Sequence, residues 1–313
     1  MHRVSDQTIA TPAPSKALPL AALIVANVAL AFGPWFVRLT DVGPVAAGFW
    51  RLGLAAPVLL AIAAIDGQRP VAQARGLWGV LAIGGLAFAG DLATWHAGIH
   101  HTQLANSTLF GNAATLIFPI YGFIVARRWP TATQGAALAM AAVGGALLMG
   151  RSAQLSPQNL IGDLLCLTAG VLYAVYFIIM ARVRATMHPV PALAFSSLFG
   201  TLPLLVAAVM LGEQVWPGAW GPILAIAIVS QLIGQGLMIY ALGHLSPLVV
   251  GLALLTQPVV AGAIGWIAYD ERLGLPDVAG ALLVGLALVL VRKGGPVAQP
   301  TLEPDAPQGH KGG

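Results

Sequence analysis

Long apolar stretches separated by short polar ones dominate the sequence. Each stretch holds about 20 mostly apolar residues, enough for one helix to cross a bilayer, where all backbone polar groups must be bonded within the helix. The connections between them, such as "DGQRPVAQARG", carry the Gly, Pro and charged residues typical of turns. The pattern predicts an all-α membrane protein with ten transmembrane helices, at about residues 17–37, 44–65, 77–99, 103–126, 131–150, 162–182, 189–211, 218–242, 246–268 and 274–292.

Composition supports contact with a lipid bilayer. Hydrophobic residues make up 58% of the chain and charged residues only 8%, whereas soluble domains carry about 25% charged residues. The net charge of +4 is spread over loop ends, which argues against nucleic acid as a partner. Cys166 is the only cysteine, which excludes an intrachain disulfide and a thiolate metal cluster. Residues 1–16 are polar and lack the apolar core of a signal peptide, and residues 294–313, rich in Pro and Gly, are expected to be disordered.

Lysine and arginine indicate how the chain lies in the membrane. The N-terminus and alternate loops carry eleven of them, but the opposite loops carry only Arg38, Arg151 and Arg272. Because Lys and Arg accumulate in cytoplasmic loops, both termini are expected to be cytoplasmic, with the chain in a bacterial inner membrane.

The two halves of the chain contain a weak internal repeat. A shift of 143 residues places Thr115 on Pro258, and a shift near 141 places Trp35 on Tyr176. Each half, 17–150 and 160–293, is expected to hold five spans. Because five is odd, the halves would be inverted relative to each other. Inverted repeats recur in secondary transporters, with the substrate site near the midplane between them.

Several motifs resemble those of a known family. "DLATWHAGIHHTQLANSTLFGNAAT", "GDLLCLTAGVLYAVYF" and the stretch from "GQGLMIYALGHLSP" to the last span resemble the EamA-type branch of the drug/metabolite transporter superfamily. The most specific match is Gln257-Pro258 followed by "DERL" at 270–273, and Arg51 also matches. The resemblance implies a ten-helix exporter with alternating access, without a cofactor, whose cavity is lined by helices one, three, four, six, eight and nine. It also implies substrates such as amino acids and related metabolites or, as in relatives, drugs or nucleotide sugars.

Two opposite charges lie at similar depth within neighbouring expected spans. Asp91 is about eight residues, or roughly 12 Å, from the outer end of its helix, and Arg51 is about seven residues from the same side. Charges inside a membrane usually face the bundle interior and often pair. Asp91 is therefore either a proton acceptor or amine ligand, or half of a structural ion pair with Arg51. Trp95, one turn after Asp91, is either part of a binding site for an organic cation or a tryptophan at the membrane interface.

Three histidines follow Asp91. His96 and His100 share a helix face, a spacing that metal sites use, but no Cys, Asp or Glu cluster completes such a site, and no metal is expected. His100 and His101 fall at the expected outer boundary, and His96 is a candidate proton relay.

The remaining polar side chains in the spans indicate a neutral, hydrogen-bonding pocket. Alternatively, each of these side chains could form a hydrogen bond that only holds two helices together. The candidates for substrate contact, besides Asp91 and Trp95, are Trp35, Asn112, Thr115, Tyr173, Tyr176, Gln231, Gln235 and Gln257, with Asn27 nearby in helix one.

Together these features predict a secondary transporter that exports small metabolites such as amino acids or related amines. An intramembrane enzyme built on Asp91 and the histidines would need a second acidic or nucleophilic group nearby, and the sequence shows none. A passive pore or scaffold would need polar stripes along several helices or large loops, and the sequence shows neither. The chain contains no Walker-type phosphate loop, so direct drive by ATP is not expected. The sequence leaves open whether the protein is a monomer or a dimer.

Overall fold

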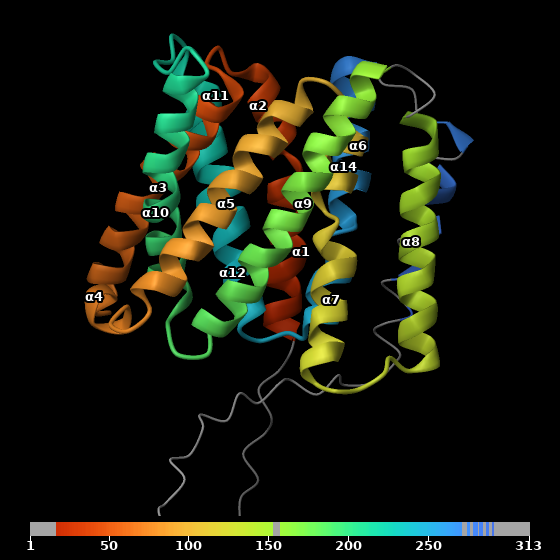
Figure 1. Cartoon of the computed structure of the whole chain (residues 1–313), viewed down its shortest axis with the longest axis horizontal. Coiled ribbons are helices and arrows are strands. Elements are labelled where there is room, and N and C mark those ends of the chain that lie inside the picture. Colours follow the sequence, from red (N-terminus) through yellow and green to blue (C-terminus); the bar gives the residue numbers. More distant parts are fainter. Residues whose placement is uncertain are drawn as a thin grey trace, which may run out of the picture.

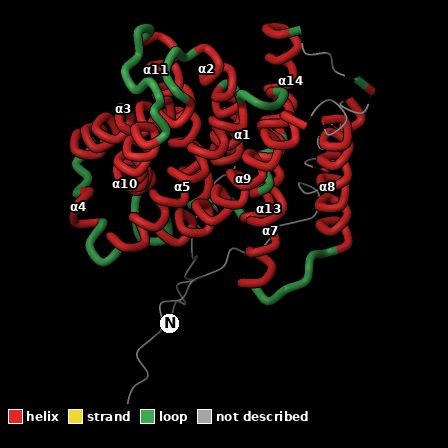
Figure 2. Tube along the Cα trace, turned by 45° about the horizontal axis from the view of Figure 1, so that its top comes forward, coloured by secondary structure: helices red, strands yellow, loops and turns green. Residues whose placement is uncertain are grey.

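The computed structural model describes residues 17–152, 157–270, 274–275, 278–280, 282–283, 286–287 and 290. Within these residues the regular structure is helical and contains no strand (Figures 1 and 2), which confirms the all-α prediction. The helices are α1 (Ala17–Ala31), α2 (Gly33–Leu39), α3 (Pro44–Ile65), α4 (Pro70–Gln73), α5 (Trp78–Ile99), α6 (Leu104–Gly111), α7 (Ala114–Val125), α8 (Ala132–Ser152), α9 (Pro157–Val183), α10 (Pro189–Met210), α11 (Trp220–Ala225), the π-helix η1 (Ile226–Gln235), α12 (Gly236–Leu242), α13 (Pro247–Ala253) and α14 (Thr256–Tyr269).

Seven described segments are long and apolar enough to cross a membrane: Ala17–Leu39, Pro44–Ile65, Trp78–Ile99, Asn159–Val183, Pro189–Met210, Trp220–Leu242 and Pro247–Tyr269. Two shorter apolar helices, Ala114–Val125 and Ala132–Gly144, occupy the expected fourth and fifth spans. The expected tenth span, 274–292, is described only in part, and the expected terminal segments 1–16 and 294–313 lie outside the described residues.

Four of the expected spans are not continuous α-helices. The first breaks at Phe32 between α1 and α2, the fourth at Asn112–Ala113 between α6 and α7, and the ninth at Leu254–Leu255 between α13 and α14. The eighth changes to a π-helix over ten residues before α-helix resumes. An apolar pattern is the same on both sides of a break, so the sequence does not reveal these interruptions. Non-helical backbone at membrane depth is tolerated where protein covers it.

The core is built around α5, which packs against α9 and α10, while α10 also packs against α3. The α5–α9 contact depends on small residues: a Cβ atom at Gly98 would lie 2.8 Å from the carbonyl oxygen of Gly162. Around this core, α1 contacts η1 and α12, and α6 contacts α9 and α14. Elements from both halves of the chain therefore meet in the centre of the bundle.

The loop after α10 holds the N-terminus of α3. The Glu213 carboxylate accepts hydrogen bonds from the backbone N–H groups of Val45 (3.3 Å) and Ala46 (2.8 Å), two free donors of the first helical turn. Trp50 Nε1 donates to the carbonyl oxygen of Val215 at 2.7 Å. These bonds fix the first two turns of α3, and Arg51 is the next residue along the helix.

Candidate functional site

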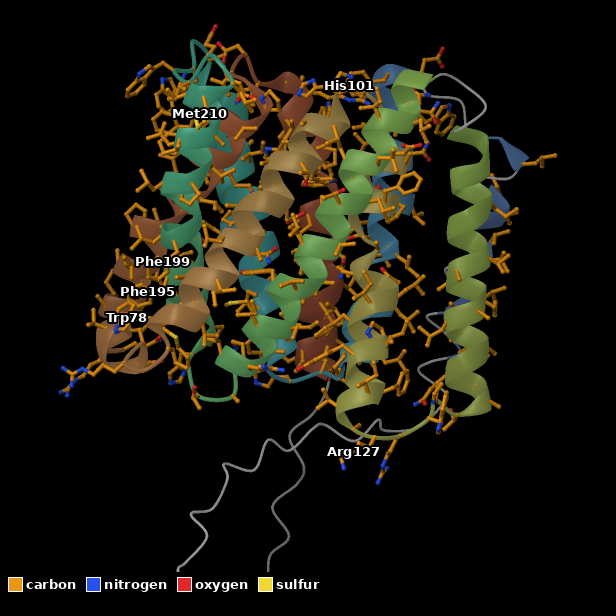
Figure 3. The ribbon with its side chains drawn as sticks, in the orientation of Figure 1. Trp78, His101, Arg127, Phe195, Phe199 and Met210 are labelled. Carbon is orange, nitrogen blue, oxygen red and sulfur yellow. The ribbon has the colours of Figure 1, made fainter. Side chains whose placement is uncertain are left out.

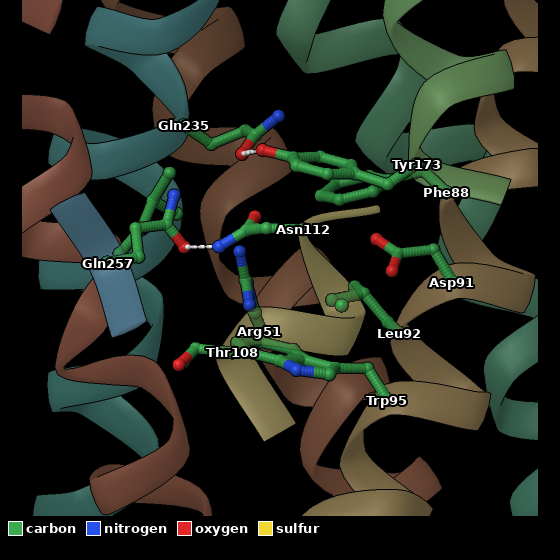
Figure 4. Close-up of a pocket in the computed structure, with 12 residues that line it drawn as sticks. Arg51, Phe88, Asp91, Leu92, Trp95, Thr108, Asn112, Tyr173, Gln235 and Gln257 are labelled. Carbon is green, nitrogen blue, oxygen red and sulfur yellow. Dashed lines mark hydrogen bonds between the residues drawn. The ribbon is translucent and has the colours of Figure 1, made fainter. Parts of the chain in front are cut away.

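A small cavity lies in the centre of the bundle (Figure 4). Both halves contribute to its wall, through α1, α3, α5 and α6 on one side and α9, η1 and α14 on the other. The centre of a water molecule can occupy about 30 Å³ of this cavity, which is enough room for about two water molecules. This space is smaller than an amino acid. Its lining residues are Leu30, Arg51, Phe88, Asp91, Leu92, Trp95, Thr108, Gly111, Asn112, Tyr173, Gln235 and Gln257.

Asp91 and Arg51 both line this cavity but are not joined directly. Asp91 is 6% exposed and Arg51 is 2% exposed, and no nitrogen of Arg51 comes within 4.0 Å of an Asp91 oxygen. The Asp91 carboxylate forms no hydrogen bond or ion pair with any described residue, and Arg51 Nη1 also has no partner among them. In Figure 4 the carboxylate points into the space between Arg51, Asn112 and Tyr173. The arrangement is two buried, opposite charges across a small cavity, not a direct ion pair.

Gln231 holds the Arg51 side chain in place. Arg51 Nε donates to Gln231 Oε1 at 2.9 Å, and Gln231 Nε2 donates to Ser197 Oγ at 3.0 Å. The guanidinium also lies 5.8 Å from the centre of the Phe88 ring. Gln231 is thus behind Arg51 and not in the cavity wall, so its contribution is to orient the charge.

A second chain of amides crosses three helices. Asn112 Nδ2 donates to Gln257 Oε1 (3.2 Å), Gln257 Nε2 donates to Asn27 Oδ1 (2.9 Å), and Asn27 Nδ2 donates to the Leu23 carbonyl (2.8 Å). Asn112 also donates to the carbonyl oxygen of Leu254 at 3.3 Å. Asn112 lies at the break between α6 and α7, and Leu254 at the break between α13 and α14. The two helix breaks therefore lie side by side, and the Asn112 side chain bonds a backbone carbonyl at the second break.

The two predicted tyrosines of α9 have different positions. Tyr173 lines the cavity, and its hydroxyl donates to Gln235 Oε1 at 3.0 Å, which leaves Gln235 Nε2 buried without a partner in the described structure. Tyr176 is fully buried outside the cavity wall, stacked on Phe88 with ring centres 4.4 Å apart, and its hydroxyl bonds to Ser196. Tyr173 therefore faces the cavity, whereas Tyr176 packs behind its wall.

Trp95 is buried and lines the cavity. Its side chain is 9% exposed, and Nε1 donates to the Ser107 carbonyl at 3.0 Å. The ring lies so close to α6 that a Cβ atom at Gly111 would be 2.8 Å from Trp95 Nε1. Glycine at 111 thus leaves room for the Trp95 ring close to the α6 backbone.

The three histidines do not converge. His96 is fully buried, and its Nδ1 donates to the Pro44 carbonyl at 2.9 Å, a bond that ties α5 to the start of α3. His100 and His101 lie just beyond the end of α5, where burial and the positive charges of Arg38 and His101 lower the pKa of His100. In the part of the chain that the structure describes, no three His, Cys, Asp or Glu side chains are grouped to hold a metal ion.

Two further candidates lie away from the cavity wall. Thr115 is buried in the first turn of α7, just after the break in the fourth span, and its hydroxyl has no described partner. Trp35 is half-buried in an aromatic group with Phe32 and Phe36 at the start of α2. The sequence reasoning missed Leu30, Phe88, Leu92, Thr108 and Gly111 in the wall, although Phe88 and Leu92 follow from their helical spacing to Asp91 and Trp95.

Comparison with known proteins agrees with this architecture. The model of the EamA-like transporter family matches residues 17–150 and 160–293. The chain belongs to the EamA-like transporter family. It is 22% identical over 244 residues to an uncharacterized transporter of Archaeoglobus fulgidus, a match that covers 75% of this chain and 83% of that protein. It is 23% identical over 200 residues to the uncharacterized transporter YyaM of Bacillus subtilis, covering 61% and 66% of the two chains.

A crystal structure with 17% identity has the same fold, with a TM-score of 0.70 over 88% of this chain and 95% of the other. The family match establishes a multi-pass membrane transporter built from two EamA repeats, and with it a bilayer and a small-molecule substrate as partners.

Proposed function

We propose that this EamA-family protein is a secondary transporter that exports small metabolites of the amino-acid or amine type by alternating access. The observation that carries the proposal is the small central cavity, whose wall comes from both halves of the chain and contains Asp91 and Arg51 without a direct ion pair. Burying an unpaired charge within a membrane costs at least about 2.5–3.5 kcal/mol, so such residues usually have a function.

The polar atoms of the cavity complement a solute that carries both an ammonium and a carboxylate group. The Asp91 carboxylate and the Trp95 ring together suit a cation. The unpartnered nitrogens of Arg51 and Gln235 are donors for an anionic oxygen. One acid and one base favour an amino acid or amine over a polyanion.

The direction of transport and its energy source complete the proposal. We place both termini in the cytoplasm of a bacterial cell because Lys and Arg accumulate on that side. Asp91 is our candidate for proton coupling, because its carboxylate faces the cavity and lacks a described partner that would hold it ionised. His96 bonds to Pro44 instead, so we assign it a structural role.

Uptake of labelled amino acids into proteoliposomes, with and without an imposed pH gradient, tests the proposal. We expect saturable uptake that the gradient accelerates. Uptake that ignores the gradient would remove proton coupling and leave a facilitator. If folded protein transports neither amino acids nor simple amines, the proposed substrate class is wrong.

A further inference from the structure

Two arginine–tyrosine contacts connect the two repeats, one at each end of the bundle. At one end, the Arg38 guanidinium lies over the Tyr269 ring, 4.9 Å from its centre. At the other end, the Arg182 guanidinium lies 5.8 Å from the centre of the Tyr121 ring. Arg38 also donates to the Thr102 carbonyl (2.7 Å) just after α5, close to His101, and Tyr121 is in the last turns of α7, close to Arg127. Figure 3 shows His101 and Arg127 at opposite ends of the molecule.

The contacts occupy similar places in the inverted repeats, at the same ends of the same spans, although a shift of 143 residues places Tyr121 five residues before Tyr269. Arg38 and Arg182 are each the penultimate residue of the first span of their repeat. Tyr121 and Tyr269 each lie within the last five residues of the fourth span. In both contacts the arginine of one repeat meets the tyrosine of the other. Because the repeats are inverted, the same contact recurs at both ends of the molecule.

Both contacts join spans that line the cavity. Leu30 of the first span, Tyr173 of the sixth, Asn112 of the fourth and Gln257 of the ninth all line the cavity. Each contact therefore joins a pair of cavity-forming spans beyond one end of the cavity. Both contacts are formed here, in agreement with a cavity that holds only about two waters.

The geometry points to two alternating latches, Arg38–Tyr269 and Arg182–Tyr121, that open in turn on opposite sides of the membrane. This inference rests on the proposed transport function. During the cycle one latch separates while the other persists, so that the cavity opens to one side only. The energies of such contacts are small, which suits gates that must open on every cycle.

The latches differ in chemistry, which provides matched controls. Arg182 donates to the Tyr121 hydroxyl through Nε (3.1 Å) and Nη2 (2.8 Å), whereas Arg38 lies over the Tyr269 ring and donates to backbone carbonyls. Replacing Tyr121 with Phe removes the acceptor of two hydrogen bonds. Replacing Tyr269 with Phe keeps the ring face. We expect Tyr121→Phe to weaken its latch and Tyr269→Phe to have no effect.

The test measures access to the cavity from each side separately. In a Cys166→Ala background, Leu92→Cys places one thiol in the cavity wall, and a membrane-impermeant thiol reagent is added to one side of oriented vesicles. We expect Tyr269→Leu to raise the labelling rate about two- to fivefold from the Arg38 end only, and Tyr121→Leu to do so from the Arg182 end only. Tyr121→Phe should act as Tyr121→Leu does, which keeps the test open if a leucine variant fails to fold.

Equal changes from both sides, a change at the wrong end, or unchanged labelling in folded variants would overturn the latches. Labelling needs no substrate, so this outcome is independent of the uptake measurement. Failure of uptake with side-specific labelling would reject the proposed substrates but keep the latches.

Discussion

Asp91→Asn is expected to reduce gradient-driven uptake by about tenfold or more, the loss that follows from one charged hydrogen bond worth about 1.5–3 kcal/mol. The remaining uptake should no longer respond to a pH gradient, because asparagine cannot take up a proton. The folded yield should not fall, since the carboxylate forms no bond to any described residue. Thermal unfolding should show little change, because the substitution removes one buried charge but leaves the Arg51 charge without its compensation.

A buried aspartate outside the cavity provides the matched control. Asp163 on α9 is 4% exposed, and its Oδ1 accepts a hydrogen bond from Thr102 Oγ1 at 2.7 Å, which asparagine can also accept. Asp163→Asn should therefore retain uptake and its pH response. If Asp91→Asn kept the wild-type pH dependence, Asp91 would have no part in coupling.

Arg51→Leu is expected to have the second largest effect, on stability as well as on transport. Gln231 Oε1 loses the donor at 2.9 Å, and an unsatisfied buried polar group costs about 1–3 kcal/mol. The cavity also loses its positive charge, so Asp91 is left without compensation. We expect a lower unfolding temperature together with loss of amino-acid uptake.

Adding Asp91→Asn to Arg51→Leu separates the two causes. If the charges compensate each other across the cavity, the double variant should be more stable than Arg51→Leu alone, although it still lacks transport. Additive losses of stability would mean that the two side chains do not interact. Normal uptake by Arg51→Leu would exclude Arg51 from substrate binding.

Much of this architecture could be predicted from the sequence, because lipid imposes a simple rule on the chain. Apolar runs of about 20 residues must form helices, and the resemblance to the EamA-type branch agreed with ten helices arranged as two repeats. The same rule hides the interruptions. The fourth and ninth spans are interrupted at Asn112 and Leu254, where the surrounding protein covers the backbone. The number of apolar residues is the same for an interrupted span and for a continuous helix, so it cannot distinguish them.

The candidate site was predicted in part, for a related reason. Polar residues are rare in the spans, so Asp91, Arg51 and Tyr173 could be found by their type alone. Whether a polar side chain faces the cavity or supports the wall depends on helix rotation and on partners distant in sequence. Gln231 and Gln235 are one turn apart, yet Gln231 binds Arg51 and Gln235 lines the cavity. Apolar wall residues such as Leu92 have no distinguishing sequence signal beyond their spacing.

The central claim is that the cavity beside Asp91 is where the substrate binds. Protection of a thiol at Leu92→Cys by substrate tests it most directly, in the Cys166→Ala background with a small thiol reagent. We predict that an amino acid that the protein transports slows labelling in a saturable way, and that Asp91→Asn removes this protection. Transport of the same amino acid with no protection at any concentration would contradict the claim and place the binding site elsewhere.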